Sequence, residues 1–312
     1  MSVRVVTEAP QTPKRGRGPW ILAAIGLAVA LIAVLVQLIG KPATPPAPTS
    51  TPTVDGSSSA TVQPSATTSV PETAPAPTMG VLGTVVDGLW RGTATVATGS
   101  TDVIFGVPIG WDRTVDGAVA AAMHTSAAFY ALPSVVEDTA AELNPHLYTG
   151  TALDDMLTGE TMVAFRAQLR KICRLSDEGV VVDANGNPST EERYLGGGIP
   201  EYGAYQVRDV ESSNGAVTRV EVAVFQPVYS GPATDTNTTE VLLMFRKSVY
   251  VMTWTDGDWK VADWGELDEP KGPWEVAYSN QGFEWIRQQI GPGWAVPADA
   301  TEDPLPGAVM TR

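Results

Sequence analysis

Few side chains in this 312-residue sequence could move protons or attack a substrate, and their spacing matches no catalytic arrangement. The two histidines are His124, within an alanine-rich segment, and His146, which follows Pro145. Asp116 is the acid best placed to pair with His124, yet the two positions lie more than two helical turns apart. We therefore expect a protein that is not an enzyme. An acid beside His124 inside a cavity would instead favour the hypothesis of a hydrolase or an isomerase.

The polar segment that begins at Asp183 starts like a calcium-binding loop, with Asn185 and Asn187 at the next ligand positions. That loop also needs glycine at its sixth position and glutamate at its twelfth, where this chain has Pro188 and Tyr194. Histidine and cysteine nowhere have the spacing of a zinc site. We therefore expect a polar turn here and no metal.

Residues 195–198, Leu-Gly-Gly-Gly, lack the lysine and the following helix of a phosphate-binding loop. They predict a flexible connection, and no cofactor is expected. Cys173 is the single cysteine, which excludes an intramolecular disulfide. The folded part must therefore be stabilised by its own core.

Tryptophan is concentrated in the last quarter of the chain. This residue dominates the energetic hot spots of protein interfaces, which favours a partner-binding surface, but buried tryptophans also build cores. Two of them, at positions 254 and 259, flank one predicted turn, so we expect at least one to be exposed. The candidate partner-binding residues are Trp254, Trp259, Trp264 and Trp274.

Residues 19–40 form a long uncharged, apolar run of the length that an α-helix needs to cross a bilayer. Lys14, Arg15 and Arg17 precede it and only Lys41 follows it closely, which predicts a cytoplasmic N-terminus and an extracytoplasmic C-terminal part. Residues 1–18 are then a cytoplasmic tail. The alternative, a cleaved signal peptide, has a shorter apolar region and a small-residue cleavage site.

Residues 41–80 are dense in proline, threonine, serine and alanine, a composition that predicts an extended, disordered linker. The net charge of -15 opposes binding to nucleic acid, which requires clustered lysine and arginine. We expect a folded domain over residues 81–296 and a loose tail over residues 297–312. The domain could also form a homo-oligomer.

Within the domain the apolar pattern changes from helical to strand-like. Helical spacing predicts helices at 115–127, 134–143 and 161–174, the second ended by Pro145, with the basic side chains of the third, Arg166 among them, mostly on its polar face. Alternation predicts strands at 205–210, 217–229, 241–246, 249–255 and 259–264, with Asn214-Gly215 and Asp256-Gly257 as hairpin turns. A last helix is expected at 280–290. Helices followed by an antiparallel meander indicate an α+β fold with the helices on one face of the sheet.

Two segments carry a resemblance to known families. VLLMFRKSVYVMTWTDGDWKVADW (residues 241–264) resembles the closing hairpin of the NTF2-like superfamily, whose fold is a cone of N-terminal helices packed on a curved antiparallel sheet. GVPIGWDRTVDGAVAAAMHTSAAF (residues 106–129) resembles the first helix of membrane-anchored proteins of actinobacterial conjugative elements. Those proteins are similar to the VirB8/TcpC-type components of type IV secretion machines. TcpC-like proteins carry two such domains, and this chain has room for one.

The resemblance implies an extracytoplasmic scaffold in a conjugation-type secretion apparatus, held in the membrane and acting through contact with other secretion proteins. The alternative is an extracytoplasmic binding module for a small apolar ligand or a cell-wall glycan. A cone filled by its own side chains favours the scaffold, whereas a cavity with convergent polar groups favours the binding module.

Overall fold

The computed structural model describes residues 84–86, 89–235, 237, 240–267, 286 and 288–301. The chain divides into two units, residues 1–62 and 63–312, and the described residues belong to the second. Within the described ranges no helix is long and apolar enough to span a bilayer. The predicted tail, membrane helix and linker (1–80) lie outside these ranges, as does most of the predicted helix 280–290.

The helices come first along the folded part. In α2 (Val115–Ala128) the Thr114 side chain accepts a hydrogen bond from the Gly117 amide at 3.0 Å, and Asp116 occupies the first turn, where the helix dipole favours an acid. The helix thus begins where its capping residues predict. The other helices are α3 (Leu132–Val135), α4 (Glu137–Leu147), α5 (Gly150–Thr158) and α6 (Glu160–Ile172).

The main sheet has the strand order β1-β2-β10-β6-β7-β8-β9, and β5 pairs with the far half of β7. Neighbouring strands are antiparallel except for β2 and β10. A short 3-10 turn (Pro200–Tyr202) precedes β6. The strands are β1 (Thr84–Val86), β2 (Leu89–Arg91), β5 (Arg193–Gly198), β6 (Ala204–Ser213), β7 (Ala216–Ala233), β8 (Leu242–Thr255), β9 (Asp258–Glu266) and β10 (Ala295–Val296), with β3 (Asp102–Ile104) and β4 (Val107–Ile109) forming a separate hairpin.

Both predicted hairpin turns are confirmed. Asn214 and Gly215 have φ values of 53° and 77°, and Asp256 and Gly257 have values of 54° and 83°. Two consecutive residues with positive φ are the signature of a type I′ turn, whose twist matches that of the strands it joins. These turns connect β6 to β7 and β8 to β9, so local sequence sets the register of the meander.

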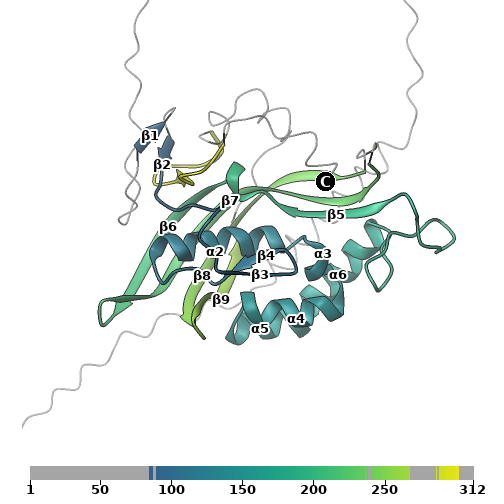
Figure 1. The fold of residues 1–312 in the computed structure, drawn as a ribbon, viewed down its shortest axis with the longest axis horizontal. Helices are drawn as coiled ribbons and strands as arrows, with labels where there is room; N and C mark the ends of the chain where they lie inside the picture. The colour runs from purple at the N-terminus through teal and green to yellow at the C-terminus, as the bar shows by residue number, and fades with distance from the viewer. Residues whose placement is uncertain are drawn as a thin grey trace, which may run out of the picture. The chain divides into compact units, whose positions relative to one another are not determined.

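Alternate residues of the central strands face opposite sides of the sheet. The side that carries Val222, Val224 and Tyr250 packs against α2, which lies across the sheet in Figure 1. Alanine dominates this helix, and the small side chains let it approach the sheet closely. Buried residues cover the other side: Ile286, Ile290, Trp294, Val296 and Ala300 pack with Ala223, Phe225 and Phe245. Helices on one face of an antiparallel sheet make this an α+β fold.

The prediction treats α3 and α4 as one helix and omits α5, and it differs from the structure at two further positions in the helices. It ends the second helix before Pro145, whereas α4 continues to Leu147, because a proline in the last turn breaks only one backbone hydrogen bond. It also places Arg166 on a polar face, but this side chain is 4% exposed. Its guanidinium donates to the carbonyl oxygens of Met156 at 2.6 Å and Leu157 at 2.9 Å, and so caps the end of α5.

The structure also corrects the predicted strands at two places. Residues 241–246 and 249–255, predicted as two strands, form the single strand β8. Residues 195–198, predicted as a flexible connection, belong to β5. A Cβ atom at Gly198 would lie 2.8 Å from the Cα atom of Ala127, so glycine is required where β5 passes α2.

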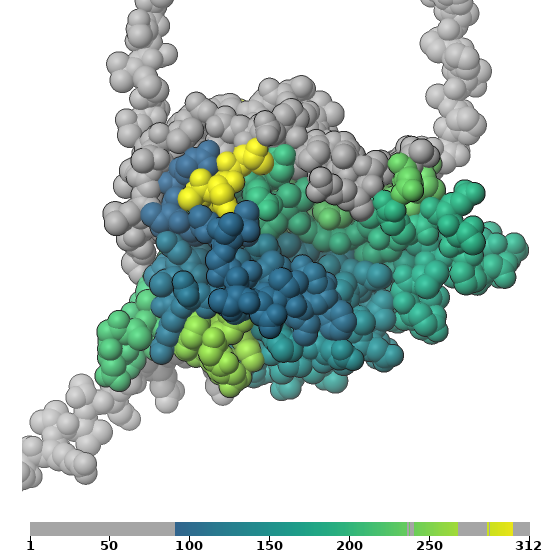
Figure 2. All heavy atoms as spheres, in the orientation of Figure 1, coloured from purple at the N-terminus to yellow at the C-terminus, as the bar shows by residue number. Residues whose placement is uncertain are grey.

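The structure also describes residues 297–301, which fall where the prediction begins a loose tail. The Arg91 guanidinium donates to the carbonyl oxygens of Ala298 at 3.0 Å and Ala300 at 2.9 Å. The Asp299 carboxylate accepts the amide of Val96 at 3.0 Å. Figure 2 shows these C-terminal residues, in yellow, against the segment that follows β2. Residues 297–301 are therefore part of the domain.

Candidate functional site

The tryptophans predicted to bind a partner lie in different environments. Trp259 is 2% exposed and belongs to the main core, so it does not contribute to a surface of the domain. Trp254 and Trp264 are half-buried and pack against that core. Trp254 also lies under the guanidinium of Arg113, 5.6 Å from the ring centre. Trp274 lies outside the described residues.

Side chains next to the turn between β8 and β9 form hydrogen bonds with a segment that is far away in the sequence. The Asp258 carboxylate accepts hydrogen bonds from the amides of Gly110 at 2.7 Å and Trp111 at 3.0 Å. The indole of Trp259 donates to the carbonyl oxygen of Asp112 at 2.8 Å. Hydrogen bonds to a charged carboxylate are stronger than neutral ones. This turn therefore fixes the hairpin that ends just before Gly110.

That hairpin, residues 102–109, is here called the contact hairpin. Its turn consists of Phe105 and Gly106, with φ values of 50° and 82°. Val103 and Phe105 are 58% and 44% exposed, although both are large and apolar, while Val107 on the facing strand is buried. A left-handed conformation is unfavourable for phenylalanine, so the backbone at this turn is strained. The Phe105 ring is nevertheless exposed to solvent. The tryptophan pattern does not predict this surface, and its signal in the sequence is the Phe-Gly turn between short apolar runs.

The helix side of the sheet carries a buried cation. Arg246 on β8 is 6% exposed, and its Nε donates to the Glu266 carboxylate of β9 at 3.0 Å. The guanidinium lies 3.9 Å above the Phe129 ring centre and 5.8 Å from that of Trp264. Burial lowers the pKa of Arg246, but the Glu266 carboxylate and nearby Tyr250 more than compensate, so the pKa ends above its usual value. Arg246 is therefore charged inside the domain.

Several buried polar atoms of the helices and of the sheet have no hydrogen-bond partner among the described residues. They include the Arg246 Nη1 atom, the Ser248 and Tyr250 hydroxyls, both polar atoms of the Asn144 side chain, the Ser126 hydroxyl and the Gln226 carbonyl oxygen. Native cores satisfy the large majority of their buried polar groups. We define the polar cluster as Arg246, Ser248, Tyr250 and Glu266.

His124 has a structural role in the described part of the chain. Its Nε2 atom lies 2.6 Å from the carbonyl oxygen of Val96, and its ring stacks on Trp111 with 5.2 Å between ring centres. A carbonyl oxygen only accepts hydrogen bonds, so Nε2 carries the proton. Burial lowers the pKa of His124, which keeps the ring neutral. Asp116 instead accepts from the Thr93 hydroxyl at 2.8 Å, so the structure does not pair it with His124.

The segment after Asp183 forms a polar turn. The Asp183 carboxylate accepts the amides of Asn185 at 2.8 Å and Asn187 at 2.9 Å, and these bonds lower its pKa. No three histidine, cysteine or acidic side chains within the described ranges gather where a metal could bind. Burial raises the pKa of the Cys173 thiol to about 12, which keeps it protonated and unreactive.

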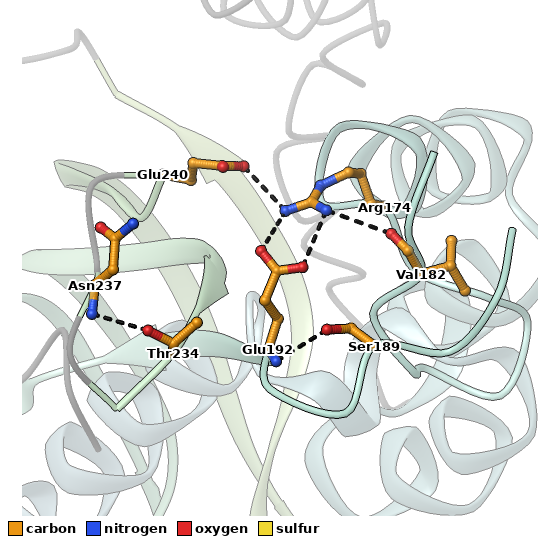
Figure 3. Close-up of polar contacts among 7 residues, drawn as sticks. All are labelled: Arg174, Val182, Ser189, Glu192, Thr234, Asn237 and Glu240. Carbon is orange, nitrogen blue, oxygen red and sulfur yellow. Dashed lines mark hydrogen bonds and ion pairs between the residues drawn. The ribbon is translucent and has the colours of Figure 1, made fainter. Parts of the chain in front are cut away.

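A surface ion cluster joins the end of α6 to the turn before β8 (Figure 3). The Arg174 guanidinium donates to both oxygens of Glu192, at 3.1 and 2.7 Å, and to Glu240 at 3.2 Å. Its hydrogen bonds with Glu192 raise the pKa of Arg174 and lower that of Glu192. These partly exposed contacts tie loops together and bring no reactive group into a site.

No family model and no curated protein matches this sequence. Among solved structures, the intermembrane space region of the chloroplast protein ARC6 aligns with 14% sequence identity over 50% of this chain and 96% of that chain. The TM-score of this alignment is 0.28, which carries no argument about the function of the chain.

Proposed function

We propose that this chain is an assembly component of a conjugation-type secretion apparatus and acts through protein–protein contact. In this proposal helix 19–40 anchors it in the membrane of an actinobacterial cell, with the folded domain on the extracytoplasmic side. The support is the resemblance of residues 106–129 and 241–264 to the VirB8/TcpC-type components. We also assign the domain to the NTF2-like cone, which is consistent with helices packed on one face of an antiparallel sheet.

The observation that carries the contact role is the contact hairpin. Exposed apolar side chains gain most from binding when they are already held in place, because little conformational entropy is then lost. The carboxylate of Asp258 provides that rigidity at the base of the hairpin. Phe105 at the tip and Val103 beside it form a small apolar surface suited to a shallow pocket on a partner.

A photo-crosslinking amino acid placed at residue 105 of the full-length chain tests this role in living cells. We expect a discrete crosslinked product containing another secretion component, since Phe105 would lie in the interface. The matched control is residue 180, where Val180 is 42% exposed on a different part of the domain. Equal crosslinking from both positions, or none from residue 105, would contradict the proposal.

A second candidate is an extracytoplasmic binding module for a small, largely apolar ligand. The unpartnered polar atoms on the helix side of the sheet favour it, because binding sites commonly combine apolar walls with a few convergent polar groups. This function does not exclude the assembly role, and it uses a different part of the domain.

A further inference from the structure

The polar cluster occupies one face of one strand. Arg246, Ser248 and Tyr250 alternate along β8, so their side chains all point toward the helices. Glu266 is paired with Ser248 across β8 and β9. Because the Arg246 guanidinium bonds to Glu266, its side chain leans along the strand toward Ser248. The charged group and the two hydroxyls therefore lie in one row.

Aromatic rings surround this row. Phe129 and Tyr130, at the end of α2, lie 3.9 and 5.8 Å from the guanidinium carbon, and Trp264 of β9 lies 5.8 Å from it. Tyr148, after α4, is close enough for its hydroxyl to interact electrostatically with both Arg246 and Tyr250. Tyr130 and Trp264 are only half-buried and the Glu266 side chain is 29% exposed, so these three residues are the most accessible ones around the cluster.

Each group of the row can donate a hydrogen bond, and the two hydroxyls can also accept one. The Arg246 Nη1 atom can only donate, and the hydroxyls of Ser248 and Tyr250 can each donate as well. All three are without a partner among the described residues, although their side chains are more than nine-tenths buried. Unmade hydrogen bonds of buried donors lower stability, so a core built only for packing would not keep three on one strand. The row suits an oxygen that accepts several hydrogen bonds.

Charge decides which kind of oxygen fits. Glu266 already neutralises Arg246, so a carboxylate or phosphate would add an unpaired negative charge beside the buried guanidinium. The chain as a whole carries a net charge of -15, which also disfavours an anion. An uncharged carbonyl oxygen has two lone pairs and adds no charge. The rings of Phe129, Tyr130 and Trp264 would then contact an aromatic or aliphatic ring attached to it.

We propose that the polar cluster binds a small uncharged molecule that combines a carbonyl oxygen with an apolar ring. The oxygen accepts hydrogen bonds with its two lone pairs from the Arg246 guanidinium and the Tyr250 hydroxyl, and the ring displaces the half-buried side chains of Tyr130 and Trp264. This inference rests on the second candidate function, the binding module, and is independent of the contact hairpin.

Fluorine NMR on the full-length chain in lipid nanodiscs tests the ligand class, with empty nanodiscs as the blank. The probes are 4-fluoroacetophenone, its hydrocarbon analogue 4-fluoroethylbenzene and the anion 4-fluorobenzoate. We expect saturable binding of the ketone at least about tenfold tighter than that of either analogue, the difference that one hydrogen bond of about 1.4 kcal/mol makes. Tighter binding of the benzoate or equal binding of the hydrocarbon refutes the carbonyl assignment and leaves a binding module. If none of the probes binds saturably, the carbonyl assignment and the binding-module function are both overturned.

Two tyrosine variants supply a readout that does not depend on the probes. Tyr250→Phe removes an unpartnered hydroxyl, so we expect weaker ketone binding together with a thermal midpoint about 2–4 °C higher. Tyr194→Phe is the matched control, because its hydroxyl donates to the Tyr130 carbonyl oxygen at 2.7 Å and its loss should lower the midpoint. A lower midpoint for Tyr250→Phe would show that internal water satisfies its hydroxyl, and unchanged ketone affinity would show that it does not bind the ligand. Either result overturns the proposal.

Discussion

Replacing Trp259 by alanine should lower the free energy of unfolding by about 3–5 kcal/mol, the usual cost of removing a large aromatic side chain from a core. The indole is 2% exposed, and its nitrogen donates to the Asp112 carbonyl oxygen at 2.8 Å. The substitution therefore leaves a cavity and removes the hydrogen bond to the Asp112 carbonyl oxygen. Urea unfolding of the full-length chain, followed by far-ultraviolet circular dichroism, measures the change.

Trp254 provides the control for this prediction. It lies opposite Trp259 in the β8–β9 hairpin but is only half-buried. Trp254→Ala should cost clearly less, about 1–2 kcal/mol, because part of the ring already contacts water. Equal losses at the two positions would mean that Trp259 is not the buried member of the pair.

Replacing Glu266 by alanine should destabilise the domain by about 2–3 kcal/mol. The substitution leaves the buried guanidinium of Arg246 without its counter-ion, and a charge in a medium of low polarity is costly. The expected loss is smaller than for a fully buried pair because the Glu266 side chain is 29% exposed, so water can reach the site. Urea unfolding at neutral pH measures the loss.

A second substitution separates charge from packing. Adding Arg246→Met to Glu266→Ala removes the stranded charge and keeps a flexible apolar side chain, so most of the lost stability should return. Glu240→Ala is the surface control, since its bond to Arg174 is exposed and should contribute under about 0.5 kcal/mol. A double variant less stable than Glu266→Ala alone would refute the account of Arg246 as a buried cation held by one acid.

The parts of the fold that depend on neighbouring residues could be predicted from the sequence. Thr114 is followed three positions later by the amide that it caps, and each hairpin turn is set by two consecutive residues such as Asn214 and Gly215. The many alanines of α2 also indicate a helix that can pack closely against the sheet. In each case the cause and the structure lie within a few residues of each other.

The candidate sites depend on residues that are far apart in the sequence. Arg246 and Arg166 occur among polar or alternating residues, and nothing local shows that Glu266 or the end of α5 will satisfy them. The role of Asp258 requires Gly110, which approaches only after the sheet has formed. Hydrophobic patterning assigns charged side chains to the surface, so it misses those that long-range hydrogen bonds draw inside.

Conjugal transfer from donor cells that express a hairpin variant tests the central claim most directly. Phe105→Asp places a charge on the exposed tip of the contact hairpin, and Val180→Asp places one on an exposed site elsewhere. With equal amounts of each chain in the membrane fraction, we expect Phe105→Asp to reduce transfer at least about tenfold, as the loss of an interface hot spot would. Val180→Asp should leave transfer unchanged. Wild-type transfer by the Phe105→Asp chain would contradict an assembly role for this hairpin.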